Sequence, residues 1–119
     1  MTTKEIATKL AEYCRKAEWE KAQQELYADN AVSIEPYETP DFAKETRSKQ
    51  AIIEKGKKFT GMTVEMHSIE VSQPLLAENS FAFRMEMDIT TKGHGRMKMP
   101  ELCVYEVKDG KIISEHFFI

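Results

Sequence analysis

A single carboxylate interrupts an otherwise apolar strand face in the stretch MKMPELCVYEVK. Side chains alternate between the two faces of a strand, so every second residue shares one face. The odd-numbered members of this stretch are Met97, Met99, Glu101, Cys103, Tyr105 and Val107. Glu101 is therefore either a sign that this register is wrong or a residue that does chemistry. A carboxyl group in apolar surroundings resists ionisation, which suits an acid or base that works near neutral pH.

A second candidate for proton transfer is His116, in the final stretch SEHFF. The ordinary pKa of histidine, about 6.5, allows the ring to gain or lose a proton near neutral pH. The structural alternative is a histidine on a sheet surface or at a dimer interface. Neither Cys14 nor Cys103 belongs to a CxxC pair, so the sequence predicts no metal site.

The composition is that of an ordinary soluble domain. The chain has 119 residues, of which 41% are hydrophobic and 31% charged, with a net charge of −3. We therefore expect one domain over residues 1–119 with a core of its own. The slightly acidic balance gives no reason to expect nucleic acid as a partner. We predict a cytoplasmic protein for three reasons. The N-terminus lacks the apolar run of a signal peptide, no stretch is long enough to span a membrane, and cysteines are few.

Helices are expected in the first half of the chain. Thr2 and Glu5 have the spacing of a capping box, and apolar residues then recur at helical intervals through 3–17. A second helix is predicted over 18–27 and a third over 48–59. A short strand, AVSIE at 31–35, and a loop with two prolines at 36–47 lie between them. The loop is long enough to cover something.

Strand patterns dominate the second half. Residues 63–71 alternate loosely, and 81–89 alternate strictly between apolar and polar side chains. Asp109-Gly110 supplies the turn of a final hairpin that ends at Ile119. Three helices followed by antiparallel strands predict an α+β fold, with the helices packed on one face of a curved sheet.

Three stretches carry a resemblance to a known family. They are EWEKAQQELYADNAV, AIIEKGKKF and VYEVKDGKIISEHFF, the last being a strand, an Asp-Gly-Lys-Ile turn and an aromatic-rich strand. With this order of elements the chain resembles the SnoaL-like family of the nuclear-transport-factor-2/ketosteroid-isomerase superfamily. The resemblance implies a cone-shaped α+β domain in which a curved antiparallel sheet and about three N-terminal helices enclose an apolar pocket. The same fold hosts enzymes, binding modules and assembly domains, so the likeness identifies the fold better than the reaction.

The resemblance also implies which residues form the site. Residues expected to line the pocket are Phe83, Met85, Met87, Met97, Met99 and Cys103, and His116 is added as a further candidate. In ketosteroid isomerases the base ends the first strand just before a proline, a position held here by Glu35. Their oxyanion donors are a first-helix tyrosine, which Tyr13 would match, and a protonated acid on the final hairpin, near Glu101 or Cys103. In SnoaL-like cyclases a pocket carboxylic acid is the general acid/base, which makes Glu101 the candidate for that role.

Each of these residues has a structural alternative. Glu101 could pair with Arg96, Arg84 or a helix lysine, and Glu35 could be a solvated turn residue. Tyr13 could bury its ring against the core and send its hydroxyl to a neighbour. The methionines could simply fill the core, although in a fold built around a cavity the two interpretations merge.

Two functions follow as expectations. The first is a cofactor-free and metal-free enzyme that isomerises or cyclises a small, largely apolar carbonyl compound, with Glu101, Glu35 and Tyr13 as catalytic groups. The second is a non-catalytic ligand-binding or dimerisation domain. The positions of two side chains separate these functions. The enzyme requires that Glu101 and Glu35 open onto one cavity and that lysine or arginine side chains do not neutralise both of them. A homodimer through the outer sheet face is also predicted, formed by Leu102, Val104, Ile112 and Phe118 or their neighbours.

Overall fold

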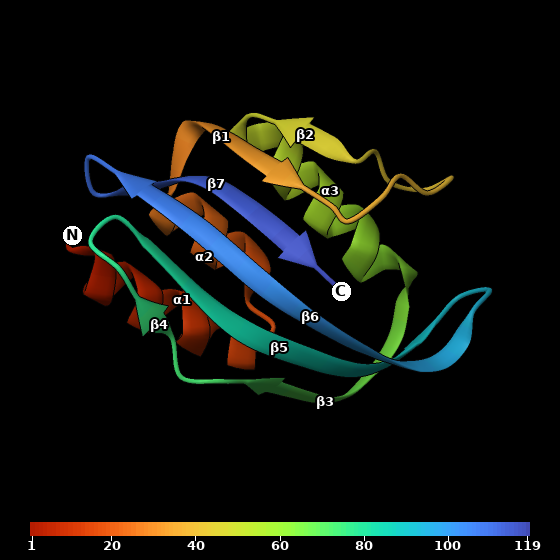
Figure 1. Cartoon of the computed structure of the whole chain (residues 1–119). Helices are drawn as coiled ribbons and strands as arrows, with labels where there is room; N and C mark the ends of the chain where they lie inside the picture. The colour runs from red at the N-terminus through yellow and green to blue at the C-terminus, as the bar shows by residue number, and fades with distance from the viewer.

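The structure, a computed structural model of residues 1–119, contains three helices and seven strands. In chain order they are α1 (Thr3–Arg15), α2 (Trp19–Leu26), β1 (Tyr27–Ile34), β2 (Glu45–Arg47), α3 (Lys49–Met62), β3 (Thr63–Val71), β4 (Leu75–Leu76), β5 (Ser80–Thr91), β6 (Gly95–Lys108) and β7 (Lys111–Phe118). All three helices lie on one side of a strongly curved sheet, as Figure 1 shows. The predicted α+β cone is confirmed.

The sheet is mixed rather than wholly antiparallel. The strand order is β2-β1-β7-β6-β5-β3, with β4 paired to β5. The long strands β5, β6 and β7 are antiparallel neighbours, but β7 runs parallel to β1. The expectation of a purely antiparallel sheet is corrected here, because local alternation cannot reveal that the last strand pairs with the first.

The helix ends follow their capping residues. The Thr2 hydroxyl accepts a hydrogen bond from the Glu5 amide at 3.1 Å, and the Glu5 carboxylate accepts one from the Thr2 amide at 3.0 Å. This is the predicted capping box. Helix α1 ends at Arg15, two residues earlier than expected, because Ala17 turns the chain with φ of 55°. A non-glycine residue in this left-handed region leaves no glycine signal in the sequence.

Loss of the capping box should weaken the protein measurably. Thr2→Ala removes the acceptor for the Glu5 amide, and such caps are worth about 1 kcal/mol. We expect thermal unfolding of this variant to occur a few degrees below that of the wild type. Lys4→Ala, an exposed change in the first turn of α1, serves as the control. Equal melting temperatures for Thr2→Ala and wild type would contradict the assignment of a stabilising cap.

The core lies between the helices and the concave face of the sheet. Strand β5 alternates as predicted, and its inward residues Phe81, Phe83, Met85, Met87 and Ile89 are all buried. They pack against α1, whose buried stripe includes Ile6, Leu10 and Cys14. The strict alternation of β5 therefore reflects a strand with one face on the core and the other face turned outward.

The β6–β7 hairpin turns at the predicted dipeptide and then departs from strict alternation. Asp109 and Gly110 have φ of 52° and 75°, as a two-residue hairpin turn requires. The pairing register then shifts, because Val107 is opposite Ile112 whereas Glu106 is opposite Ser114. Ile113 is thus an extra residue, a β-bulge that reverses the inward and outward phase of the rest of β7. Glu115 and Phe117 consequently face inward with their partners Tyr105 and Cys103.

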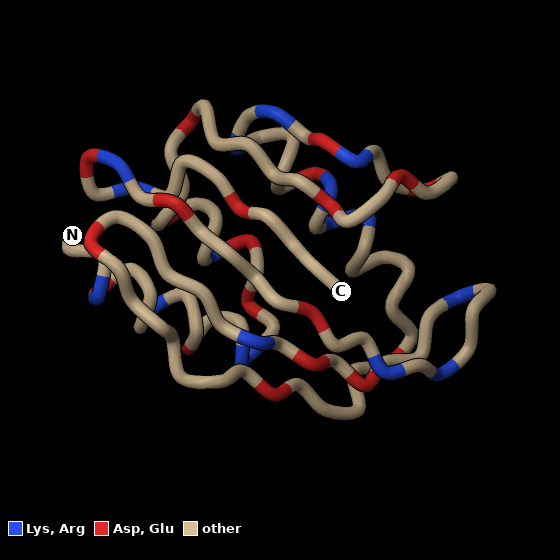
Figure 2. The backbone as a smooth tube through the Cα atoms, viewed as in Figure 1, with Lys and Arg blue, Asp and Glu red and all other residues tan.

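Charged residues are distributed over the whole chain. Figure 2 shows Lys and Arg interspersed with Asp and Glu along the backbone. None of the helices is long and apolar enough to cross a membrane. The loop at 36–47, predicted to cover something, ends in β2, which pairs with the end of β1.

Candidate active site

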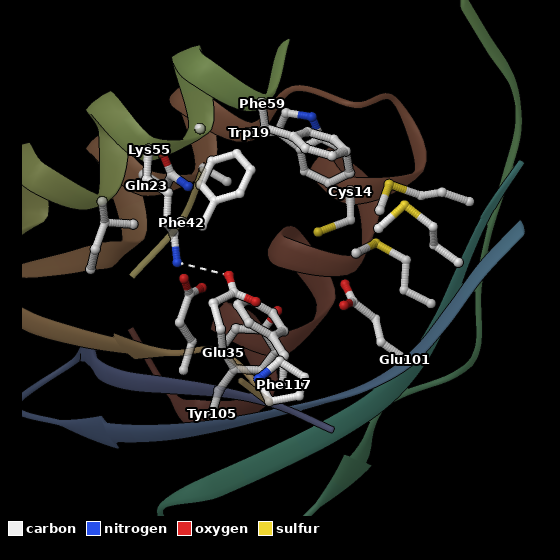
Figure 3. A pocket seen from close by; sticks show the side chains of 18 of the residues that line it. Cys14, Trp19, Gln23, Glu35, Phe42, Lys55, Phe59, Glu101, Tyr105 and Phe117 are labelled. Carbon is white, nitrogen blue, oxygen red and sulfur yellow. Dashed lines mark hydrogen bonds and ion pairs between the residues drawn. The ribbon is translucent and has the colours of Figure 1, made fainter. Parts of the chain in front are cut away.

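A cavity of about 280 Å³ lies between the helices and the concave face of the sheet, and Figure 3 views it from close by. Of its 23 lining residues, 15 are hydrophobic. The loop after β1 contributes Tyr37 and Phe42 to the lining. The segment 36–47, predicted to cover something, thus places two aromatic side chains against the cavity. The few polar groups on an apolar lining fix what the cavity can recognise.

Three methionines form one wall. Met85, Met87 and Met99 line the cavity, and the β5–β6 register brings them together, with Met87 opposite Met99 and Met85 opposite Glu101. Phe83 and Cys103 are buried in the core but are not among the lining residues, and Met97 packs against the core without lining the cavity.

Glu101 sits at the end of this wall with its carboxyl group directed into the cavity (Figure 3). The only side chain within hydrogen-bonding range is the thiol of Cys103, with Sγ at 3.9 Å from Oε1. The proposed arginine partners are engaged elsewhere: Arg96 forms a two-bond ion pair with Asp88 at 3.0–3.1 Å, and Arg84 pairs with Glu86. Burial, followed by the negative charges of Glu35 and Glu115, raises the pKa of Glu101 to about 7. The carboxyl group can therefore both accept and donate a proton near neutral pH.

Glu35 points into the same cavity. It lies two and four residues beyond the buried Ser33 and Ala31, so it continues the inward face of β1. Its carboxylate pairs with the Lys55 ammonium at 3.0 Å. The Lys55 ammonium also donates to Ser33 Oγ at 2.6 Å and lies 5.8 Å from the centre of the Phe117 ring. Of the two carboxylates expected at the site, Glu35 is thus neutralised by a lysine and Glu101 is not.

Glu115 is a third carboxyl group on the cavity, and the sequence did not single it out. Only 4% of the residue is exposed. It accepts hydrogen bonds from the Tyr27 hydroxyl and from Ser33 Oγ, the latter at 2.6 Å. Burial raises its pKa, although Lys55 and these two hydroxyls oppose the shift. A continuous chain of hydrogen bonds thus runs from Lys55 through Ser33 to Glu115 and Tyr27.

Besides Phe83, Met97 and Cys103, the structure places two further predicted residues away from the cavity. Tyr13 precedes Cys14, which lines the cavity. The Tyr13 side chain therefore points about 100° away from that of Cys14 around the helix axis. Its hydroxyl donates to Glu25 of α2 at 2.9 Å. His116 faces the outer side of the sheet, where it stacks on Phe118 at 4.1 Å, because the bulge at Ile113 has reversed the alternation.

The lining also includes aromatic residues from α2 and α3 that sequence reasoning missed, Trp19 and Phe59. Both pack against the core from their helices, and apolar spacing along a helix does not distinguish a core position from a cavity wall. No group of three or more His, Cys, Asp or Glu side chains is arranged to hold a metal ion. The cation that lies among the cavity carboxylates is the ammonium of Lys55.

Removing the charge of Glu35 should make Glu101 more acidic. Glu35 is the charged neighbour that contributes most to the raised pKa of Glu101, and its loss also frees Lys55. We expect the pKa of Glu101 in Glu35→Gln to fall below the wild-type value of about 7, as measured by carboxyl ¹³C NMR titration. Glu106→Gln, an exposed change on the outer face of β6, should leave it unchanged. An unchanged pKa in Glu35→Gln would show that the two carboxyl groups do not interact.

Comparisons with known proteins agree with this architecture. A family model described as a SnoaL-like domain matches residues 1–119. A candidate SnoaL-like polyketide cyclase from Mesorhizobium loti is 32% identical over the full length of both chains, with a TM-score of 0.92. No curated protein matches the chain significantly in sequence.

Two more distant structures share the fold alone. A Catenulispora acidiphila protein with a ketosteroid isomerase-like fold, in complex with trimethylamine, is 12% identical, with a TM-score of 0.75 over 100% of this chain and 87% of that one. A Mycobacterium tuberculosis protein in complex with estradiol-17β-hemisuccinate is 14% identical, with a TM-score of 0.72 over 100% and 95% of the two chains. Matched over its whole length by the family model, the chain belongs to the SnoaL-like family.

Proposed function

We propose that this protein binds a small, largely apolar carbonyl compound in the cavity and that Glu101 moves a proton at the carbon next to the carbonyl. One observation carries the proposal: Glu101 has no cationic partner and faces an apolar cavity that also holds the Glu35–Lys55 pair. A carboxyl group whose pKa lies near the working pH is suited to accept and return a proton.

The proposed step begins with ionised Glu101. Its carboxylate takes a proton from the carbon, the electron pair of the broken C–H bond forms a C=C bond, and the carbonyl electrons move to the oxygen. Lys55 has three N–H groups, two of which are engaged by Glu35 and Ser33, so one remains to donate to the enolate oxygen. Where a C=C bond is conjugated with the enolate, return of the proton from Glu101 to its far carbon isomerises the compound. Attack of the enolate carbon on a second carbonyl closes a ring instead, and the alkoxide formed from that carbonyl takes the proton from Glu101.

Relatives support a small-molecule role. The Mesorhizobium loti relative is a candidate polyketide cyclase, and two proteins that share the fold were solved with small organic molecules bound. The cavity of about 280 Å³ is slightly smaller than typical ligand pockets, which span roughly 300–1,000 Å³. We therefore favour a compact substrate.

Deuterium exchange tests the proposed reaction directly. Small ketones that raise the melting temperature of the protein are incubated with it in D₂O, and loss of the α-proton signal is followed by NMR. The proposal predicts exchange faster than in buffer alone for at least one ketone that binds. Binding without any acceleration would favour the second candidate, a non-catalytic ligand-binding domain. The pairing of Glu35 with Lys55 and the outward placement of Tyr13 are the observations that keep this second candidate open.

We propose a homodimer through the outer face of β6 and β7. Leu102 and Phe118 are paired across these strands and remain 46% and 44% exposed, and His116 stacks on Phe118. Ile112, expected to contribute, is instead fully buried in the core. Sedimentation should show a dimer for the wild type and a monomer for Leu102→Glu, whereas Lys92→Glu in the exposed turn between β5 and β6 should not change the oligomeric state. A monomeric wild type would refute the dimer.

A further inference from the structure

The charges that line the cavity are unbalanced. Three carboxyl groups, those of Glu35, Glu101 and Glu115, line it together with the ammonium group of Lys55. Lys55 pairs with Glu35 at 3.0 Å, and Glu115 receives only neutral hydroxyl donors from Tyr27 and Ser33. Glu101 is left without any cation. An isolated charge in apolar surroundings is costly, so Glu101 either holds its proton or needs a positive charge beside it, and a positively charged ligand would favour the ionised form.

Aromatic rings surround the same space. They come from α2, α3, the loop after β1 and two strands: Trp19, Tyr37, Phe42, Phe59, Tyr105 and Phe117. Two of these rings already lie beside ammonium groups, with Lys55 Nζ 5.8 Å from the Phe117 centroid and Lys58 Nζ 5.2 Å from that of Phe42. The face of an aromatic ring attracts a cation, and this attraction grows when water is excluded.

We propose that the ligand of this cavity carries a positively charged nitrogen, as a tertiary or quaternary ammonium group, which lies among the aromatic rings with Glu101 as its counter-ion. The inference rests on the proposed function, since it names the charge of the compound on which Glu101 acts. The two are compatible, because a fixed positive charge within the substrate also stabilises the enolate that proton removal creates.

The neighbours of Glu101 decide how binding depends on pH. Ionisable groups of four elements and of the loop after β1 face it: Cys14 of α1, Lys55 of α3, Cys103 of β6, Glu115 of β7 and Glu35 of the loop. From β5, the residue opposite Glu101 is the apolar Met85. Because the pKa of Glu101 is about 7, its ionised fraction changes about tenfold between pH 6 and pH 8. An ammonium ligand prefers the ionised form, whereas a neutral ligand that displaces water prefers the protonated form.

Three probes of the same shape test this inference. Choline carries the positive charge, 3,3-dimethylbutan-1-ol is its neutral counterpart, and 3,3-dimethylbutanoate carries a negative charge. By calorimetry at pH 8, choline should bind about tenfold more tightly than the alcohol, and the carboxylate should not bind measurably. The affinity for choline should rise about tenfold from pH 6 to pH 8, and the affinity for the alcohol should fall.

Variants assign the effect to Glu101. Glu101→Gln should abolish both pH slopes and reduce the preference for choline to the part that the aromatic rings supply, whereas Glu106→Gln on the outer face should keep the slopes and the full preference. If Glu101→Gln fails to fold, proton release by the wild type on choline binding, measured in two buffers of different ionisation enthalpy, provides the same test. Equal or tighter binding of the alcohol at pH 8, or no binding of choline at millimolar concentration, would overturn the inference.

Failure of the ammonium site can be distinguished from failure of the proposed reaction. A preference for choline without acceleration of deuterium exchange would remove the proposed reaction and leave the ammonium site. Acceleration of exchange with no preference for choline would do the reverse.

Discussion

Replacement of Glu101 by glutamine is expected to lower the rate of proton exchange at the ketone α-carbon by about 10²–10⁴-fold. Glutamine keeps the size of the side chain but can neither accept nor release the proton. Because Glu101 has no ion pair in the structure, the change breaks no salt bridge and the cavity should keep its shape. Binding of a neutral ketone, measured by thermal shift, should therefore survive while exchange is lost.

Glu106→Gln is the matched control, since it makes the same chemical change on the exposed outer face of the same strand. It should exchange protons at the wild-type rate. A Glu101→Gln variant with unchanged exchange would contradict Glu101 as the acid/base. It would direct attention to Glu35 or Glu115, the other carboxyl groups of the cavity.

The same substitution should stabilise the protein at high pH. The pKa of Glu101 is about 7 in the folded chain, against an ordinary value of 4.5. A raised folded-state pKa means that the folded state holds the proton more tightly, so stability falls as pH rises from about 4.5 to 7. Each pKa unit corresponds to about 1.4 kcal/mol, which makes the loss about 3 kcal/mol above pH 7. Glu101→Gln, which cannot ionise, should escape that loss.

Urea unfolding at two pH values measures this difference. At pH 4 the variant and the wild type should be equally stable, and at pH 8 the variant should be more stable by about 3 kcal/mol. The buried Glu115, whose pKa is also raised, gives both proteins a similar trend that cancels in the comparison. A difference between variant and wild type that does not change with pH would contradict this account. So would the same pH-dependent gain in Glu106→Gln.

The two expectations have opposite signs, and together they are diagnostic. A residue kept for packing alone should reduce stability when replaced, whereas a functional carboxyl group in an apolar cavity lowers stability in return for activity. Loss of exchange with a gain in stability at pH 8 would therefore identify Glu101 as functional.

Much of the fold could be predicted because its signals are local. The capping box at Thr2, the alternation of β5 and the Asp109-Gly110 turn depend on residues close together in the chain. Glu101 was found in the same way, since the face of β6 on which it lies is apolar in sequence and inward in the structure. Strand parity alone could not place Glu35 on the cavity, because the buried face of β1 holds the polar Ser33 and the pairing of β1 with β7 is irregular between Tyr27 and Val32.

The remainder depends on information that period-two or helical patterns do not contain. A single extra residue, Ile113, exchanges the faces of His116 and Glu115, so strict alternation points to the wrong residue of the pair. The rotation of α1 about its axis decides that Cys14 and not Tyr13 meets the cavity. The parallel contact of β7 with β1 and the hydrogen-bond chain from Lys55 to Tyr27 join residues that are distant in sequence.

The central claim is that the carboxyl group of Glu101, unpaired in an apolar cavity, is poised to transfer a proton near neutral pH. Titration of that carboxyl group by ¹³C NMR in the ligand-free protein, with Glu101→Gln to assign the signal, tests the claim most directly. The account predicts a midpoint at a pKa of about 7. A midpoint near the ordinary value of 4.5 would mean that Glu101 is solvated or paired, and it would contradict the claim.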